Sequence, residues 1–196
     1  MVENGEYEVP SGKLAVIVTY LEMHAPAPIK QVPLPAGVTF RQMRPSVAQY
    51  RDLFTRVGSL DWLWYGRHAL PDAELQAIID APEIAFFTLT RDGVDEALLE
   101  LDFRIKGQCE LAYFGLTPAL IGSGAGRFLM NEAITRAWAS NISRFHVHTC
   151  THDSPQALDF YVRSGFAPYK RAVDIDDDPR LNGVLPREMA SWIPIL

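Results

Sequence analysis

Three closely spaced glycines constrain this chain more than any other feature of its sequence. Gly122, Gly124 and Gly126 lie between an apolar run that ends at Leu116 and a helical pattern over residues 124–140. Glycine adopts backbone conformations that other residues avoid, and it leaves the neighbouring N–H groups uncovered. The segment therefore predicts a strand, a tight turn and a long helix in succession.

The same turn has the chemistry of an anion-binding site. A helix N-terminus carries about half a positive charge, and uncovered N–H groups add hydrogen-bond donors. The predicted helix has no acidic residue in its first turn, and its first acid is Glu132. The alternative is a glycine-rich turn that binds nothing. The residues that we expect around a bound phosphate are Ile121, Gly122, Ser123, Gly124, Ala125, Gly126 and Arg127.

Three familiar glycine motifs are excluded by residues at fixed positions. A Walker A loop needs Gly-Lys-Ser/Thr, but Gly126 is followed by Arg127 and Phe128. The dinucleotide fingerprint Gly-x-Gly-x-x-Gly, counted from Gly122, also fails at Arg127. The hydrolase motif Gly-x-Ser-x-Gly fails because Ile121 stands where its first glycine is needed. The phosphate ligand therefore belongs to another class.

The order of the predicted elements indicates an α/β fold of the mixed, α+β kind. Asp92 and Gly93 mark a hairpin within a run of three strand-like segments. Such a run followed by alternating helices and strands predicts a mixed sheet covered by helices. The elements expected from the hairpin onward are at residues 84–91, 94–105, 109–116, 124–140, 144–150, 154–164 and 166–173.

Residues 1–37 differ in composition from the rest of the 196-residue chain. A β-branched and aromatic run at 13–22 predicts one strand. The four prolines between 25 and 37 then predict a connector that is neither helix interior nor central strand. We therefore divide the chain into an N-terminal extension, 1–37, and a main domain, 38–196, that ends in an acidic tail.

Charge and composition exclude several partners. The net charge is −6 and the sequence has no basic stripe, so we expect no nucleic-acid partner. The longest apolar run, at 14–21, is too short to span a bilayer and follows acidic residues, so we expect neither a membrane span nor a secretory signal. Two cysteines, Cys109 and Cys150, form no disulfide framework, which favours a cytoplasmic location.

The glycine segment resembles the acetyl-CoA motif of the GNAT (GCN5-related N-acetyltransferase) superfamily. That motif, Gln/Arg-x-x-Gly-x-Gly/Ala, opens a long central helix directly after a strand. Gly124 and Gly126 match it, whereas Ile121 replaces the leading Gln or Arg. This replacement removes one polar contact to the pyrophosphate and leaves the backbone donors in place.

Two further segments carry the resemblance, which covers about residues 38–173. Glu110 stands as far before Ile121 as the general base of histone-type members stands before the motif. Residues 157–166 resemble the signature Ala-x-x-x-Tyr-x-x-x-Gly-Phe, with Tyr161 at its tyrosine. Residues 148–151 are similar to a bacterial subgroup, so the chain resembles an uncharacterised bacterial-type member.

The resemblance implies a GNAT fold in which two central strands splay apart and pantetheine fills the gap. It also implies an N-acetyltransferase that moves an acetyl group directly from acetyl-CoA to a small-molecule or peptide amine. Gly115 inside an apolar strand indicates a bulge or a close approach of another backbone segment. With the resemblance, this places the pantetheine along Phe114, Gly115 and Leu116.

Two side chains have implied catalytic roles. Glu110 is expected to act as the general base, with a pKa raised by Ala112, Phe114 and Leu116 on the same face of the strand. Tyr161 is expected to protonate the leaving thiolate. The alternatives are a solvated glutamate and a tyrosine that only packs in the core.

An aromatic cluster between the first two helices lies where the superfamily binds its acceptor. Trp62, Trp64 and Tyr65 are therefore expected to line the acceptor pocket. The alternative is an aromatic plug beneath a loop.

Two rival functions remain open at this point. A GNAT-like domain that binds acyl-CoA without catalysis would serve as a sensor or scaffold. Less favoured is a metal-binding protein that uses His146, His148 and His152, which alternate along one predicted strand with Cys150. The predicted N-terminal strand and acidic tail also suggest a homodimer.

Overall fold

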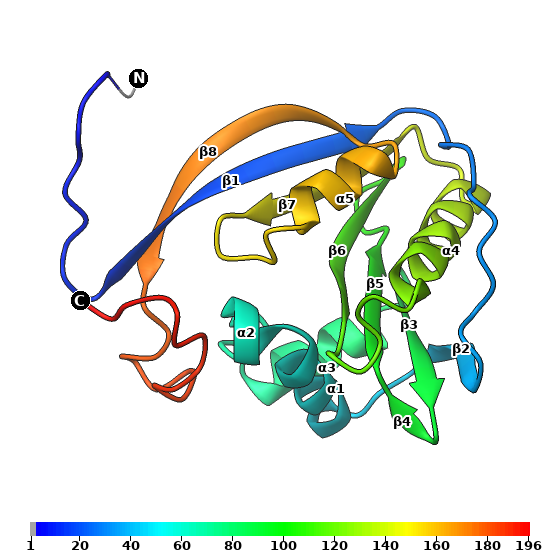
Figure 1. Cartoon of the computed structure of the whole chain (residues 1–196), viewed down its shortest axis with the longest axis horizontal. Coiled ribbons are helices and arrows are strands. Elements are labelled where there is room, and N and C mark those ends of the chain that lie inside the picture. The colour runs from blue at the N-terminus through cyan, green and yellow to red at the C-terminus, as the bar shows by residue number, and fades with distance from the viewer. Residues whose placement is uncertain (1–2) are drawn as a thin grey trace.

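The structure is a computed structural model that describes residues 3–196 and contains one eight-stranded sheet (Figure 1). The strand order is β2-β3-β5-β6-β7-β1-β8, with β4 paired to β3. All pairs are antiparallel except β6 with β7. The strands are β1 (Lys13–Met23), β2 (Val38–Met43), β3 (Ile84–Arg91), β4 (Val94–Asp95), β5 (Ala97–Asp102), β6 (Gln108–Leu116), β7 (Arg144–Cys150) and β8 (Ala167–Asp177). The predicted mixed, mostly antiparallel sheet is confirmed.

Helices cover both faces of the sheet. The helical segments are α1 (Val47–Phe54), the π-helix η1 (Thr55–Ser59), α2 (Leu60–Trp62), α3 (Asp72–Asp80), α4 (Ala125–Ala139) and α5 (Ala157–Arg163). Among residues 3–196, none of these helices is long and apolar enough to cross a membrane. The capping box that begins α1 joins Ser46 and Gln49, because each side chain binds the other residue's backbone N–H.

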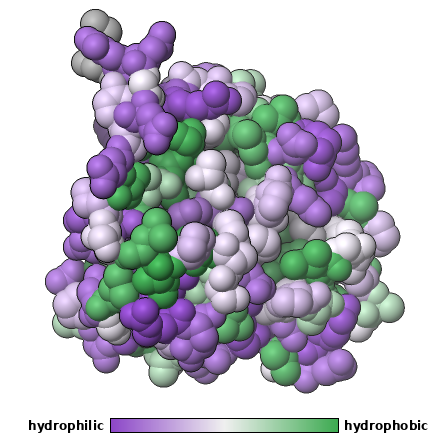
Figure 2. Space-filling model, turned by 60° about the vertical axis from the view of Figure 1, so that its left-hand side comes forward, coloured by the Kyte–Doolittle hydropathy of each residue, from purple (hydrophilic) through white to green (hydrophobic). Residues whose placement is uncertain are grey.

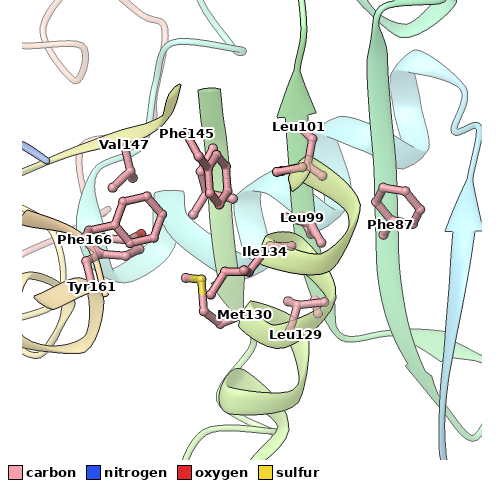
Figure 3. Packing of buried hydrophobic residues seen from close by; sticks show 14 of the residues in the cluster. Phe87, Leu99, Leu101, Leu129, Met130, Ile134, Phe145, Val147, Tyr161 and Phe166 are labelled. Carbon is pink, nitrogen blue, oxygen red and sulfur yellow. The ribbon is translucent and has the colours of Figure 1, made fainter. Parts of the chain in front are cut away.

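Two buried clusters lie on opposite faces because side chains alternate along the strands. Phe87 and Leu99 belong to the cluster beneath α4, where Figure 3 shows them facing Leu129 and Ile134. Their neighbours along the chain point the other way, toward α1 and α3. The second cluster includes Phe86, Leu98, Tyr50, Leu53, Leu75 and Ile79.

The first and last strands form a long ribbon at one side of the molecule (Figure 1). β1 pairs with β7 from Val18 onward, whereas its pairing with β8 already begins at Lys13. The strand predicted at 13–22 is therefore present, and it lies inside the sheet between β7 and β8. The acidic residues predicted as a tail, Asp174 to Asp177, instead lie in β8.

The start of α5 also differs from the sequence prediction. The sequence predicted an element over residues 154–164, but α5 begins only at Ala157, with Gln156 at its N-cap. Residues 154–156 form a turn instead, and this turn contributes to the cavity described below.

On the face of Figure 2, apolar residues form separate patches among hydrophilic ones.

The central strands β6 and β7 separate after a short paired stretch. Their last paired residues are Glu110 and His146. Just beyond, Leu111 lies opposite Leu101 and Tyr113 lies opposite Glu100, so Ala112 is an extra residue in a β-bulge. The predicted splayed strands are confirmed, and the bulge bends β6 where the two strands part.

Candidate active site

A cavity of about 700 Å³ opens where β6 and β7 separate. Its walls come from the glycine turn, β6, β7, α5, the segment after α2 and the β1–β8 ribbon. At one end the lining cations are Arg127 and Arg163, and at the other the lining acids include Asp174 and Asp176. The cavity therefore carries positive charge at one end and negative charge at the other.

The glycine turn supplies an open backbone at the cationic end. Gly122 and Gly124 have φ values of 78° and 88°, and a Cβ atom added to either would meet nothing within 4 Å. Gly124 is also the N-cap of α4, with no side chain capping the helix and no acid in its first turn. Of the first three N–H groups of this 15-residue helix, Ala125 donates to Ser123 Oγ at 3.4 Å and Arg127 donates to the Gly124 carbonyl. The Gly126 N–H is left to bind an anion, and the positive end of the helix dipole adds to the attraction.

Most residues predicted for the phosphate site line the cavity. Ile121, Gly122, Gly124, Gly126 and Arg127 do so, and Ile121 is 57% exposed. The other two predicted residues, Ser123 and Ala125, are not part of the lining. The Ser123 hydroxyl donates to the Leu120 carbonyl at 2.7 Å, and Ala125 is fully buried.

Arg127 is held in place at the edge of the cavity. Its Nη1 donates to Ser164 Oγ at 2.9 Å, and its guanidinium carbon lies 4.9 Å from the centre of the Phe160 ring. Burial, followed by repulsion from Arg163, lowers the pKa of Arg127. A bound anion between these two arginines would relieve that repulsion.

The backbone of β6 faces the gap at alternate residues. The Thr117 N–H donates to the Glu96 carbonyl, so Thr117 and Gly115 hydrogen-bond toward β5. Phe114 and Leu116 therefore direct their N–H and C=O groups toward the gap. An extended ligand chain could pair there as an additional strand.

Gly115 is required by close packing against this strand. A Cβ atom at Gly115 would lie 2.5 Å from Val57 Cγ1 and 3.3 Å from the Trp64 ring. The sequence predicted a bulge or a close backbone approach at Gly115, but the approaching groups are side chains, which come from η1 and the following link. The bulge lies three residues earlier, at Ala112.

Tyr161 lies on α5 and lines the middle of the cavity with a buried side chain. It is 7% exposed and packs against Phe114 and Phe166. Burial, with a smaller effect from Asp153, raises the pKa of the Tyr161 phenol well above its usual value. Within residues 3–196 its hydroxyl has no hydrogen-bond partner, so it is protonated and available.

Glu110 lies in a different environment from the one predicted. The bulge at Ala112 interrupts the alternation, so Phe114 lies on the face of Leu111 and not on that of Glu110. Glu110 Oε1 instead lies 3.4 Å from His148 Nδ1. The hydrogen bond with His148 lowers the pKa of Glu110, so the prediction of a raised pKa is wrong.

His148 is brought to the site by the same contact. It lines the cavity, whereas Glu110 is not among the lining residues. The hydrogen bond that His148 donates to the Glu110 carboxylate raises the pKa of His148 above its ordinary value of 6.5. A half-exposed imidazole whose pKa lies above its ordinary value is a suitable proton acceptor once it is neutral.

The predicted aromatic residues all line the other end of the cavity. The Trp64 Nε1–H donates to Asp153 Oδ1 at 2.9 Å, and the Tyr65 hydroxyl donates to Asp176 Oδ2. Trp62 lines the same end and packs edge-on against Trp192. Sequence reasoning missed the carboxylates that hold these rings in place.

The aromatic link is anchored by a buried ion pair. Glu100 is fully buried, accepts a hydrogen bond of 2.6 Å from the Tyr50 hydroxyl and pairs with Arg67. Burial raises the pKa of Glu100. The Arg67 guanidinium also lies 5.1 Å from the centre of the Tyr113 ring, which fixes the link against β6.

The histidines of the metal-binding alternative do not form a ligand set. His146 and His148 lie in β7, whereas His152 lies in the turn beyond the strand. In the described part of the chain, no three His, Cys, Asp or Glu side chains are grouped so as to hold a metal ion. His152 instead packs edge-on against Trp192.

The sequence profile of the Acetyltransferase (GNAT) family matches residues 52–166, more than half of the chain. The chain belongs to this family. Its sequence is 38% identical over 65 residues to a mycothiol acetyltransferase from Jonesia denitrificans. That match covers 33% of this chain and 20% of the relative, so the chain matches about a fifth of the relative's length.

Solved structures share the GNAT fold at low sequence identity. A GCN5-related N-acetyltransferase from Sphaerobacter thermophilus superposes with a TM-score of 0.63 at 14% identity, over 83% of this chain and 52% of that one. An aminoglycoside N-acetyltransferase in complex with CoA gives a TM-score of 0.51 at 22% identity, over 72% of this chain and 95% of that one. These likenesses confirm the fold.

Proposed function

We propose that this protein transfers an acetyl group from acetyl-CoA directly to an amine. The observation that carries the proposal is one continuous cavity with three parts in the order the reaction needs. It runs from an open helix N-terminus, past two strand edges and a buried phenol, to an aromatic and acidic end. All three parts that the reaction needs thus adjoin the gap between β6 and β7.

The residues present fit acetyl-CoA, which would supply the activated acetyl thioester. The Gly126 N–H at the start of α4, with Arg127, would bind its pyrophosphate. The gap-facing backbone of Phe114 and Leu116 would align its pantetheine, and one of these N–H groups would stabilise the oxyanion. Because Ile121 offers no polar side chain, the backbone carries the phosphate contacts.

Two groups are placed to move protons. His148, whose imidazole lines the cavity, would accept a proton from the ammonium of the acceptor, and Glu110 would stabilise the resulting imidazolium. Glu110 itself as the base is the alternative that the family resemblance favours. Tyr161 would give a proton to the leaving thiolate, because burial keeps its phenol protonated.

The decisive experiment is calorimetric titration of acetyl-CoA into wild-type protein and a Gly124→Glu variant, with NAD as a negative control. We expect micromolar binding of acetyl-CoA to wild type and none to the variant, because the new carboxylate and its bulk enter the phosphate site. Gly93→Glu is a matched control, since Gly93 has a φ of 79° and equally open surroundings on the β3–β4 turn.

Turnover separates catalysis from mere binding. Release of CoA that depends on an added amine would support the transferase. A protein that binds acetyl-CoA but releases no CoA with any amine would instead be the non-catalytic sensor or scaffold. Equal binding by wild type and Gly124→Glu would remove the glycine turn from the proposal.

A further inference from the structure

The acidic end of the cavity has carboxylates without matching cations. Asp153, Asp174 and Asp176 all line it, and the lining cations, Arg127 and Arg163, are at the glycine turn and α5. Asp153 accepts hydrogen bonds only from neutral donors, including Trp64 and the Thr149 hydroxyl. Asp176 accepts from the neutral Tyr65 hydroxyl.

Asp174 is the third of these carboxylates without an ion-pair partner. No ion pair to Asp174, Asp176 or Asp153 is formed within residues 3–196, although other acids of the ribbon are paired, as Asp177 is with Lys13. Three carboxylates thus face one cavity without a Lys or Arg partner among these residues, and a titratable group beside them is His148, whose pKa Asp153 and Asp174 help to raise. Such a wall attracts cations and repels anions.

In the β1–β8 ribbon, these acids of β8 lie beside apolar side chains of β1. Val16 lies opposite Asp174 and Leu14 lies opposite Asp176 in the antiparallel β1–β8 pair. Directly opposed residues share a face, and all four line the cavity. A ligand that lies along this wall would meet aliphatic side chains and carboxylates side by side.

Aromatic rings face the same space. Trp62 and Tyr65 line it together with Asp176, and ring faces attract ammonium groups. An independent observation comes from Tyr161, which is 7% exposed, lines the same cavity and has a hydroxyl without a partner among the described residues. The rest of this side chain is enclosed, so its unpartnered hydroxyl opens into the cavity, where it can bind a ligand atom.

We propose that the acceptor is an aliphatic amine with at least two ammonium groups, of the linear di- or polyamine class. Its reacting nitrogen would lie near His148 and Tyr161. A second ammonium would bind between Asp174 and Asp176, with the methylene chain along Leu14 and Val16. This inference rests on the proposed acetyl transfer at the same site.

The reaction balances with the groups already named. The N–C bond to the acetyl carbon forms and the C–S bond of the thioester breaks. The reacting ammonium loses two protons, one to His148 and then to solvent, and one that replaces the proton given by Tyr161 to sulfur. The second ammonium keeps its charge throughout, so its contacts with the carboxylates persist.

The test compares two amines that differ by one charge. We would titrate 1,4-diaminobutane and 1-aminobutane into the protein saturated with CoA, and measure acetylation of both with acetyl-CoA. We expect the diamine to bind at least about tenfold more tightly, with an advantage that shrinks in 0.5 M salt because exposed charge pairs are screened.

Isosteric variants identify the carboxylates responsible. Asp174→Asn with Asp176→Asn keeps the hydrogen-bonding shapes and removes two charges, so the preference for the diamine should fall to within about threefold. Asp92→Asn is the matched control, because Asp92 is exposed at φ 50° on a distant turn and asparagine tolerates that conformation. It should leave the preference unchanged.

The outcomes distinguish this inference from the proposed function. Equal binding of both amines, or an unchanged preference in the double variant, would overturn the diamine subsite. Acetylation of monoamines as fast as diamines would retain the transferase and discard the subsite. Tight diamine binding without acetylation of any amine would retain the subsite and discard the transferase.

Discussion

The hydroxyl of Tyr161 is the polar group of the cavity whose role is easiest to isolate. Tyr161→Phe keeps the ring contacts with Phe114 and Phe166, so we expect acetyl-CoA affinity to change by less than about threefold. If the hydroxyl protonates the thiolate, kcat should fall by about 10²-fold. Single-turnover and steady-state kinetics measure both effects.

The exposed Tyr7 provides a control for this substitution. Tyr7→Phe removes a hydroxyl that contacts Glu3 outside the cavity, and kcat should be unchanged. An unchanged kcat in Tyr161→Phe would reduce Tyr161 to a packing residue of the core.

The pair Glu110 and His148 predicts a particular dependence of activity on pH. The Glu110 carboxylate stabilises the imidazolium, so the pKa of His148 is raised, and neutral imidazole forms only above that pKa. The acidic limb of kcat/KM should therefore lie above the ordinary pKa of 6.5. In Glu110→Gln the pKa of His148 falls, and this limb should move to lower pH with activity retained.

The same variant tests the alternative assignment. If Glu110 is itself the base, Glu110→Gln should lower kcat by about 10²–10⁴-fold and abolish the limb instead of moving it. His148→Gln supplies the complementary result. That variant should lose the limb only if His148 titrates in it.

At the scale of elements, β6 was predicted correctly in position but not in shape. Apolar alternation located the strand, and the isolated Gly115 marked an unusual position, although its cause is the side chain of Val57 and not a backbone segment. The bulge at Ala112 leaves no comparable signal, because one extra residue changes only the pairing with β5. The face assigned to Glu110 was wrong for this reason.

Packing of η1 against β6 makes Gly115 sensitive to a single methyl group. In Gly115→Ala the new Cβ would lie 2.5 Å from Val57 Cγ1, so the π-helix must shift. We expect the free energy of unfolding to fall by about 1–3 kcal/mol. Urea denaturation measures this loss, and adding Val57→Ala should restore part of it. Strictly additive effects would show that Val57 is not the obstacle.

The acidic segment shows how an available signal was missed. Val173, Asp174, Ile175 and Asp176 alternate apolar and acidic residues, which is typical of a strand with one face in water. The density of charge favoured a tail, and the segment instead forms the end of β8 beside the cavity. The alternation could have identified both the strand and the acidic wall.

At the scale of the whole molecule, local patterns could not predict which strands are neighbours. The glycine turn was predictable because its cause is local, whereas the place of β1 between β7 and β8 depends on pairing across most of the chain. The division at residue 37 and the homodimer stay predictions. Polar substitutions along β1 would disturb the sheet itself, so they cannot report on a dimer alone.

The central position of β1 leads to a stability prediction within one strand. Leu21 is fully buried in the main cluster with Phe145 and Val147, whereas Ile17 in the same strand is 42% exposed. Leu21→Ala should lower the free energy of unfolding by about 2–5 kcal/mol, because it leaves a cavity beneath the sheet. Ile17→Ala should cost about 1 kcal/mol or less.

Comparing Leu21→Ala with Ile17→Ala also tests whether residues 1–37 unfold separately from the rest of the chain. If β1 belongs to the cooperative unit, Leu21→Ala should shift the whole transition seen by tryptophan fluorescence and far-UV circular dichroism together. A separate early transition, with the remaining unfolding unchanged, would mean that the ribbon opens independently. The acidic wall would then open with it, since Asp174 and Asp176 are held in β8 by pairing with β1.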